Sequence, residues 1–194
     1  MDNIKKIKDM IEENDGIIYT SQLTDNKMHR QYLKELENQE YIEKVSRGVY
    51  AKKGKEVNEF FLLQQRFKNG IFSHNTALYF WGLTDRTPLK IDMTFMDNVR
   101  VKDETIFSHY RKRDFYYLGI TELKLEDGTI VKLYNLERTI CDIIRDRNKE
   151  DTQIFKMALN GYMKRKDKNL LLLYRYAKIY GIEGILRQYM EVLE

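Results

Sequence analysis

Hydrophobic residues at the start of the chain first follow a helical interval and then run consecutively. Apolar side chains recur every three or four residues from Ile4 to Ile11, which predicts a helix over residues 3–14. Consecutive apolar residues at 17–19 then predict a short strand or extended link. The chain is therefore expected to open with a helix that leads into extended backbone.

The segment from Thr20 to Lys53 alternates between helical and extended patterns within a short length. Two short helical patterns, separated by a turn, precede two β-rich runs at 41–45 and 49–53. Gly48 lies between these runs and supplies the positive φ that a tight turn needs. Helix, turn, helix and a two-stranded wing, in this order, predict a winged helix-turn-helix, which is a DNA-binding module.

The second helical pattern, expected over residues 27–40, has one face suited to packing and another suited to a DNA groove. His29, Tyr32, Leu33 and Leu36 fall on one stripe at the helical angle. Side chains on the opposite face are hydrogen-bond donors for phosphate oxygens and base edges. They are Lys27, Gln31, Lys34 and Asn38, flanked by Arg30.

The start of this helix and the tip of the wing complete the expected contact set. Asp25 or Asn26 is expected to cap the helix, and Arg47 is expected to enter a minor groove. The predicted DNA-contacting residues are Thr20, Ser21, Lys27, His29, Arg30, Gln31, Lys34, Asn38 and Arg47. The alternative interpretation is an ordinary solvated amphipathic helix beside an ordinary hairpin.

Beyond a boundary expected after Gly54, the pattern predicts a larger second domain. It indicates helices at 57–67 and 76–81, strands at 90–96 and 105–110, a hairpin over 121–134 that turns at Asp127-Gly128, and helices at 136–146, 152–165, 169–180 and 182–193. The predicted fold is α+β, with a winged helix-turn-helix domain at 1–54 and, at 55–194, a small mixed sheet covered by helices.

Composition and charge narrow the class of protein. Hydrophobic residues make up 42% of the 194 residues, which is enough for a packed core. The net charge is +4, and residues 27–53 hold seven basic against four acidic side chains, a local excess of +3. The single cysteine, Cys141, is expected to be packed and inert, and no apolar run suggests a signal peptide or a membrane span. A cytoplasmic protein is expected.

Three segments together resemble a known family. RGVY at 47–50, SHNTALYFWGLTDRTP at 73–88 and NLERTICDIIR at 135–145 resemble the signature segments of AbiE-type abortive-infection antitoxins. These are the antitoxin half of a type IV toxin-antitoxin pair, and the likeness spans essentially the whole chain in the family's order. The matching positions in the second domain are Ser73, His74, Thr76, Ala77, Leu78, Gly82, Leu83, Thr84, Glu137, Arg138, Thr139 and Asp142.

The resemblance implies two linked activities in phage defence. One is transcriptional repression of the protein's own operon, with more than one copy loading cooperatively on inverted repeats in promoter DNA. The other is antitoxin activity of the second domain against a nucleotidyltransferase-like toxin, without a stable complex between the two proteins. The resemblance assigns no catalytic role to the signature positions, so we do not expect an enzyme.

Two enzymatic alternatives arise from particular residues. Ser73 beside His74, with Asp92 as a distant acid, suggests a nucleophile, although a helix cap at Ser73 with His74 packed beside it explains the same residues. Asp92 with Glu122 and Lys124 has the spacing of a D…ExK nuclease core that would hold a divalent cation. Alternation of leucines with charged residues at 122–126 also fits a half-buried strand.

Other clusters leave structural and functional interpretations open. The basic cluster of Lys164, Arg165, Lys166 and Lys168 suits either an anionic partner or a solvated helix end. Charges at 137–145 at intervals of three and four predict a structural ladder as readily as a binding surface. The three histidines and Cys141 lack zinc-ligand spacing, and no glycine pattern indicates nucleotide binding, so no metal or cofactor is expected. A further alternative is a plain winged-helix regulator whose second domain dimerises or senses a ligand.

Overall fold

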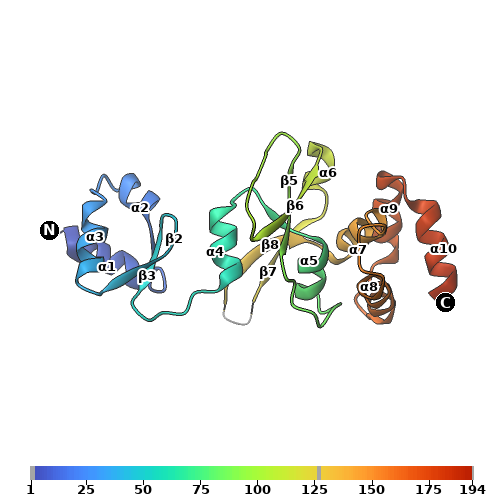
Figure 1. Ribbon diagram of the computed structural model, residues 1–194, viewed down its shortest axis with the longest axis horizontal. Helices are drawn as coiled ribbons and strands as arrows, with labels where there is room; N and C mark the ends of the chain where they lie inside the picture. Colours follow the sequence, from blue (N-terminus) through green and yellow to red (C-terminus); the bar gives the residue numbers. More distant parts are fainter. Residues whose placement is uncertain (1–2, 126–127, 194) are drawn as a thin grey trace. The chain divides into compact units, whose positions relative to one another are not determined.

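The computed structural model describes residues 3–125 and 128–193 (Figure 1). The chain divides into two compact units, Met1–Lys68 and Asn69–Glu194, referred to below as the first and second units. The first unit is longer than the 1–54 domain expected from the sequence because it includes a helix, α4 (Glu59–Arg66), that contacts strand β2. Among the described residues, no helix has the length and apolar character needed to cross a membrane.

The first unit has the helix and strand order expected of a winged helix-turn-helix. Before α4, its elements are α1 (Asn3–Glu13), β1 (Ile17–Tyr19), α2 (Thr20–Asp25), α3 (Gln31–Asn38), β2 (Ile42–Ser46) and β3 (Val49–Lys52). The three strands form an antiparallel sheet in the order β1-β3-β2. Side chains from α1, α2, α3 and the sheet meet in one core, formed by Ile7, Ile11, Ile18, Leu23, Leu33, Leu36 and Ile42.

Helix α3 is shorter than the sequence predicts. It begins at Gln31 rather than Lys27, because Lys27 has a left-handed backbone with φ of 55° and ends the preceding helical path. Asp25 and Asn26, the predicted caps, instead end α2, and the His29 Nδ1 accepts a hydrogen bond from the Gln31 N–H at 3.2 Å. His29 is exposed, so its predicted place on the packing stripe is wrong.

The second unit is built on a mixed five-stranded sheet in the order β6-β5-β4-β8-β7. Its strands are β4 (Ile71–Phe72), β5 (Ile91–Met96), β6 (Ile106–Arg111), β7 (Ile120–Lys124) and β8 (Ile130–Tyr134). The pairs β5–β6 and β4–β8 are parallel, and β4–β5 and β7–β8 are antiparallel. Of the hairpin turn predicted at Asp127-Gly128, Asp127 lies outside the described residues.

Helices cover this sheet and continue into a bundle (Figure 1). They are α5 (His74–Phe80), α6 (Arg113–Tyr117), α7 (Leu136–Arg145), α8 (Thr152–Lys164), α9 (Leu170–Tyr180) and α10 (Glu183–Leu193). Helix α5 packs on β5 and α7, α7 packs on α8 and α9, and α9 packs on α10. The α+β fold is therefore confirmed, and β4 and α6 are the elements that the sequence pattern did not predict.

Gly119 brings the backbone before β7 against helix α7. Its φ is +76°, and a Cβ at this position would lie 2.8 Å from the Arg138 Cβ. Gly181 at the end of α9 also has positive φ, +66°, but a Cβ there would meet nothing within 4 Å. The two glycines share a backbone conformation and differ in the space around them.

We therefore expect Gly119→Ala to destabilise the protein more than Gly181→Ala. The left-handed backbone costs an alanine about 1–2 kcal/mol at either position. Overpacking against Arg138 adds about 1–3 kcal/mol at residue 119. Urea unfolding of the two variants measures the difference, and equal losses would contradict the close approach.

Candidate functional site

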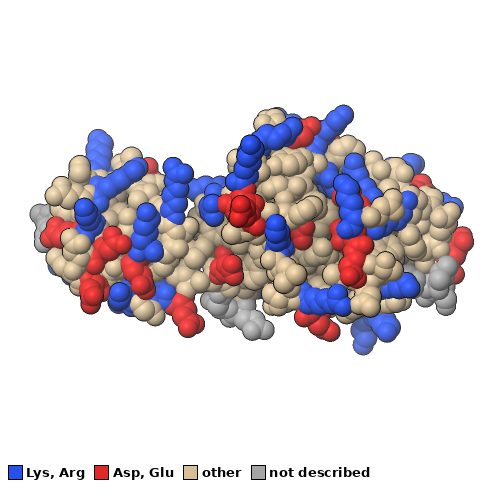
Figure 2. Space-filling model, viewed as in Figure 1, with Lys and Arg blue, Asp and Glu red and all other residues tan. Residues whose placement is uncertain are grey.

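The predicted DNA-contacting residues of the first unit lie at its surface. All nine are exposed except Thr20, which is half-buried. Gln31, Lys34 and Asn38 share one face of α3, because intervals of three and four return to the same side of a helix. Lys27 and Arg30 lie just before α3, in the turn that joins it to α2. Figure 2 shows Lys and Arg side chains over the upper part of this unit and most of its acidic side chains below.

The tip of the wing is fastened to the start of α2. The Thr20 N–H donates to the Gly48 carbonyl at 2.9 Å, and a Cβ on Gly48 would lie 2.9 Å from the Thr20 Oγ1. Gly48 has φ of +77°, as the sequence predicts for this turn. Since Arg47 precedes this anchored glycine and is exposed, its backbone is held beside the helix-turn-helix while its side chain reaches solvent.

The antitoxin-like signature positions of the second unit lie mostly inside it. Ser73, His74, Thr76, Arg138, Thr139 and Asp142 are fully buried, and Leu83, Thr84 and Glu137 are nearly so. Gly82 is exposed and has positive φ. The two segments, far apart in sequence, meet where α5 packs on α7. The signature therefore describes an interior rather than a surface.

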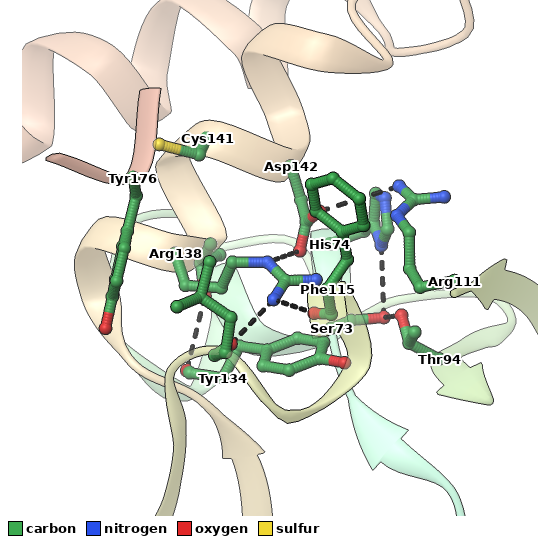
Figure 3. Close-up of polar contacts among 12 residues, drawn as sticks. Ser73, His74, Thr94, Arg111, Phe115, Tyr134, Arg138, Cys141, Asp142 and Tyr176 are labelled. Carbon is green, nitrogen blue, oxygen red and sulfur yellow. Dashed lines mark hydrogen bonds and ion pairs between the residues drawn. The ribbon is translucent and has the colours of Figure 1, made fainter. Parts of the chain in front are cut away.

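Arg138 is the centre of this interior (Figure 3). Its Nε donates to Asp142 Oδ2 at 3.0 Å, and its Nη1 donates to the carbonyls of Phe115 and Leu118. The guanidinium lies 3.9 Å from the centre of the Tyr134 ring, where a cation–π contact offsets part of its desolvation. The predicted charge ladder is thus present between Arg138 and Asp142.

Glu137 has a different role from the one its ladder spacing suggests. Its Oε1 accepts the Asn169 N–H at 2.9 Å and the Tyr162 hydroxyl at 3.4 Å. Asn169 precedes α9 and Tyr162 belongs to α8, so Glu137 joins α7 to both neighbouring helices. A buried carboxylate with two donors avoids the cost of an unpaired charge.

Ser73 and His74 do not form an accessible nucleophile. Ser73 lies at the N-cap position of α5, but its side chain makes no capping bond, contrary to the prediction. Its Oγ accepts the Thr94 hydroxyl at 2.9 Å and lies 3.0 Å from the His74 Nδ1. Ser73 is fully buried, so a substrate cannot reach this hydroxyl.

His74 and His109 form a stacked pair that the sequence did not reveal. Their ring centres are 3.5 Å apart with planes inclined by 9°. His74 Nε2 lies 3.0 Å from Asp146 Oδ2, and His109 Nε2 lies 2.7 Å from Asp92 Oδ1. Asp92, expected as a partner for His74, thus pairs with the other histidine. His74 adopts a left-handed backbone, φ of 46°, and such strain persists only where surrounding contacts fix it.

The pKa values of His74 and Asp146 are shifted by burial and by the contacts that these two side chains make. Burial lowers the pKa of His74, against the opposing effect of Asp146, and so favours the neutral ring. Burial alone would raise the pKa of Asp146, but hydrogen bonds from His74 and Arg111 outweigh it and hold this pKa well below its usual range. The Arg111 Nη2 donates to Asp146 Oδ2 at 2.6 Å.

A pocket of about 560 Å³ reaches His109, whereas His74 lies behind its lining. Its polar lining includes Asn75, Asp92, His109, Asp146 and Glu150, and its apolar lining includes Leu89, Phe107 and Ile154. Asn75 Nδ2 donates to Glu150 Oε2 at 3.0 Å, whereas its Oδ1 is buried without a partner in the described part of the chain. Burial raises the pKa of Glu150. The pocket joins groups that are far apart in sequence.

The D…ExK arrangement is not assembled. Asp92 lies on β5 and Glu122 and Lys124 lie on β7, with β4 and β8 between these strands. Neighbouring strands are about 4.8 Å apart, so the acids cannot share one cation. Glu122 and Lys124 are exposed and alternate with half-buried Leu123, as expected of a strand with one solvent face.

Two other predicted features have structural explanations. The Arg165 Nη1 donates to the Trp81 carbonyl at 2.7 Å, and the same guanidinium pairs with Asp167. Part of the basic cluster therefore bonds to groups of its own chain. Lys164 and Lys166 are exposed and Lys168 is half-buried. Burial raises the pKa of the Cys141 thiol, which agrees with an inert side chain.

Comparisons with known proteins identify a similar fold. No family model matches the chain, and no curated protein matches its sequence. A crystal structure of the RV2827C protein from Mycobacterium tuberculosis is similar, with a TM-score of 0.59 and 12% identity over 89% of this chain and 69% of that chain. At this identity the likeness shows the fold alone.

We expect Arg138→Met to destabilise the protein by about 3–5 kcal/mol, because it leaves Asp142 buried without its charge partner. The matched control is Arg187→Met, which removes an exposed pair with Glu183 at the same four-residue spacing and costs less than about 0.5 kcal/mol. Chemical unfolding compares the two. Similar losses would show that the buried pair is not essential.

Proposed function

We propose that the protein is a DNA-binding transcriptional repressor of its own operon and the antitoxin of a type IV toxin-antitoxin system that acts in phage defence. The observation that carries the first part is the outward face of α3. Gln31, Lys34 and Asn38 are exposed together there, and the anchored wing presents Arg47 beside the helix-turn-helix. Amide and ammonium groups in this arrangement suit base edges and phosphate oxygens.

The promoter is the proposed DNA partner. More than one copy of the protein loads on inverted repeats, as the resemblance to AbiE-type antitoxins implies. Acidic residues on α3, among them Glu35 and Glu37, face the same solvent, so non-specific attraction to DNA is limited. Binding then depends on well-placed contacts rather than on a large positive surface.

Antitoxin activity is assigned to the second unit. Its support is the resemblance of residues 73–88 and 135–145 to the antitoxin signature, most of whose positions are buried where α5 packs on α7. The toxin is a nucleotidyltransferase-like protein encoded beside this chain and forms no stable complex with it. The rival is a plain winged-helix regulator, favoured by the pocket beside His109, which would serve to sense a ligand.

For DNA binding, the test variant is Lys27→Ala/Gln31→Ala/Lys34→Ala. We expect it to lose specific binding to DNA from upstream of its own gene, with a salt slope reduced by about two because two phosphate contacts disappear. All three side chains are exposed, so the fold is retained. Gel shifts over a salt series measure the loss.

The matched control is Lys5→Ala/Lys6→Ala, which removes the same charge from exposed positions on α1. It should retain specific binding. Unchanged binding by the triple variant would remove the proposed interface.

For antitoxin activity, the chain is co-expressed with the product of the neighbouring gene. Full-length protein should restore growth, and the triple variant of the first unit should restore it as well, because the antitoxin signature lies in the second unit. Growth curves under separate inducible promoters measure rescue. Specific DNA binding without any rescue would favour the plain regulator.

A further inference from the structure

Three potential metal ligands converge beside the pocket of the second unit, and two of them, His109 and Asp146, line it. His74 comes from α5, His109 from β6 and Asp146 from the end of α7. One ligand atom from each lies within 4.8 Å of the others. Within the described residues, these three side chains form a group of potential ligands that could hold one metal ion.

We propose that His74, His109 and Asp146 bind one divalent transition-metal ion of the zinc class, with an open coordination position toward the pocket. Two imidazoles and a carboxylate suit zinc, cobalt or nickel, whereas calcium and magnesium prefer oxygen ligands. Three protein ligands and one open position describe the zinc sites that keep a water or a small ligand.

Each ligand contacts a second residue. The Ser73 Oγ lies 3.0 Å from His74 Nδ1, which leaves His74 Nε2 for the ion. Asp92 holds His109 Nε2 in the stacked arrangement, and Arg111 holds the Asp146 carboxylate through Oδ2. Ligands of protein-bound metals are usually fixed in this way by outer-shell hydrogen bonds.

The spacing of the ligand atoms is close to that of a metal site. Tetrahedral zinc with bonds of about 2.0–2.1 Å separates its ligand atoms by about 3.3 Å. His74 Nε2 and Asp146 Oδ2 are 3.0 Å apart. In the structure these two atoms bond to each other, and the ion would replace that hydrogen bond.

The stacked rings require one adjustment. Parallel imidazoles cannot both direct an in-plane nitrogen at one ion, so one ring must turn when the metal binds. His109 is the ring with room, because its side chain is 10% exposed and lines the pocket, whereas that of His74 is fully enclosed. Metal binding therefore breaks the stack by rotating His109, which also releases its bond to Asp92.

Charge and polarity around the site support a cation. Carboxylates of Asp92, Asp142 and Asp146 lie about the histidine pair, against the guanidinium groups of Arg111 and Arg138, so one carboxylate is in excess. The buried Asn75 Oδ1 has no partner within the described residues and lines the same pocket. A water on the open coordination position would have this acceptor available.

The test uses untagged, full-length protein stripped of metal with a chelator. Titration with Co²⁺ followed by visible absorption, and with Zn²⁺ followed by calorimetry, should show saturation at one equivalent. His109→Gln should weaken binding by more than about 100-fold.

The matched control is His29→Gln, which alters an exposed histidine of the first unit and should bind as the unaltered protein does. Far-UV circular dichroism establishes that each variant is folded. Absence of stoichiometric binding by the unaltered protein would overturn the site whatever the variants do, as would full affinity in folded His109→Gln. The titrations measure metal binding alone, so their outcome is independent of the proposed DNA-binding and antitoxin functions.

Discussion

The buried guanidinium of Arg138 is the interaction on which the second unit depends. It joins α7 to the backbone around α6 through the carbonyls of Phe115 and Leu118, and it neutralises Asp142 one turn along its own helix. Gly119 permits the close approach, since any side chain there would meet Arg138. The Nε and Nη1 groups donate hydrogen bonds, whereas Nη2 is buried without a hydrogen-bond partner among the described residues. The rings of Tyr134 and Tyr180 lie against the guanidinium, and these cation–π contacts offset part of the cost of burying the charge.

The same network positions the histidine pair. Asp142 lies between Arg138 and Arg111, at 3.0 and 3.5 Å, and Arg111 in turn holds Asp146. Asp146 contacts His74, which stacks on His109. A chain of charged contacts therefore runs from the centre of α7 to the pocket. Changes at the buried salt bridge are expected to reach the pocket floor through side chains that have little freedom to relax.

Sequence patterns predicted most helices and strands because the apolar residues of each element recur at one regular interval. The helix of residues 3–13, the hairpin of β7 and β8 and the four C-terminal helices were predicted on this basis. Helix α3 begins later than predicted, because the left-handed backbone at Lys27 cannot be recognised from the spacing of apolar residues. The histidine pair was missed for another reason. Ligand-spacing rules detect histidines on one element, whereas His74 and His109 meet only after α5 packs on β5 and β6 pairs with β5.

The burial of the resembling positions shows which part of the second unit the family resemblance describes. The positions at which residues 73–88 and 135–145 resemble AbiE-type antitoxins lie mainly inside the second unit. Polar groups in an interior specify which elements meet, because an unpaired one is costly. A resemblance of this kind therefore concerns the architecture of the second unit and the pocket that its elements form. Arg138 and Asp142 are fully buried, so a partner of the second unit would meet the surface that this interior supports rather than these two side chains.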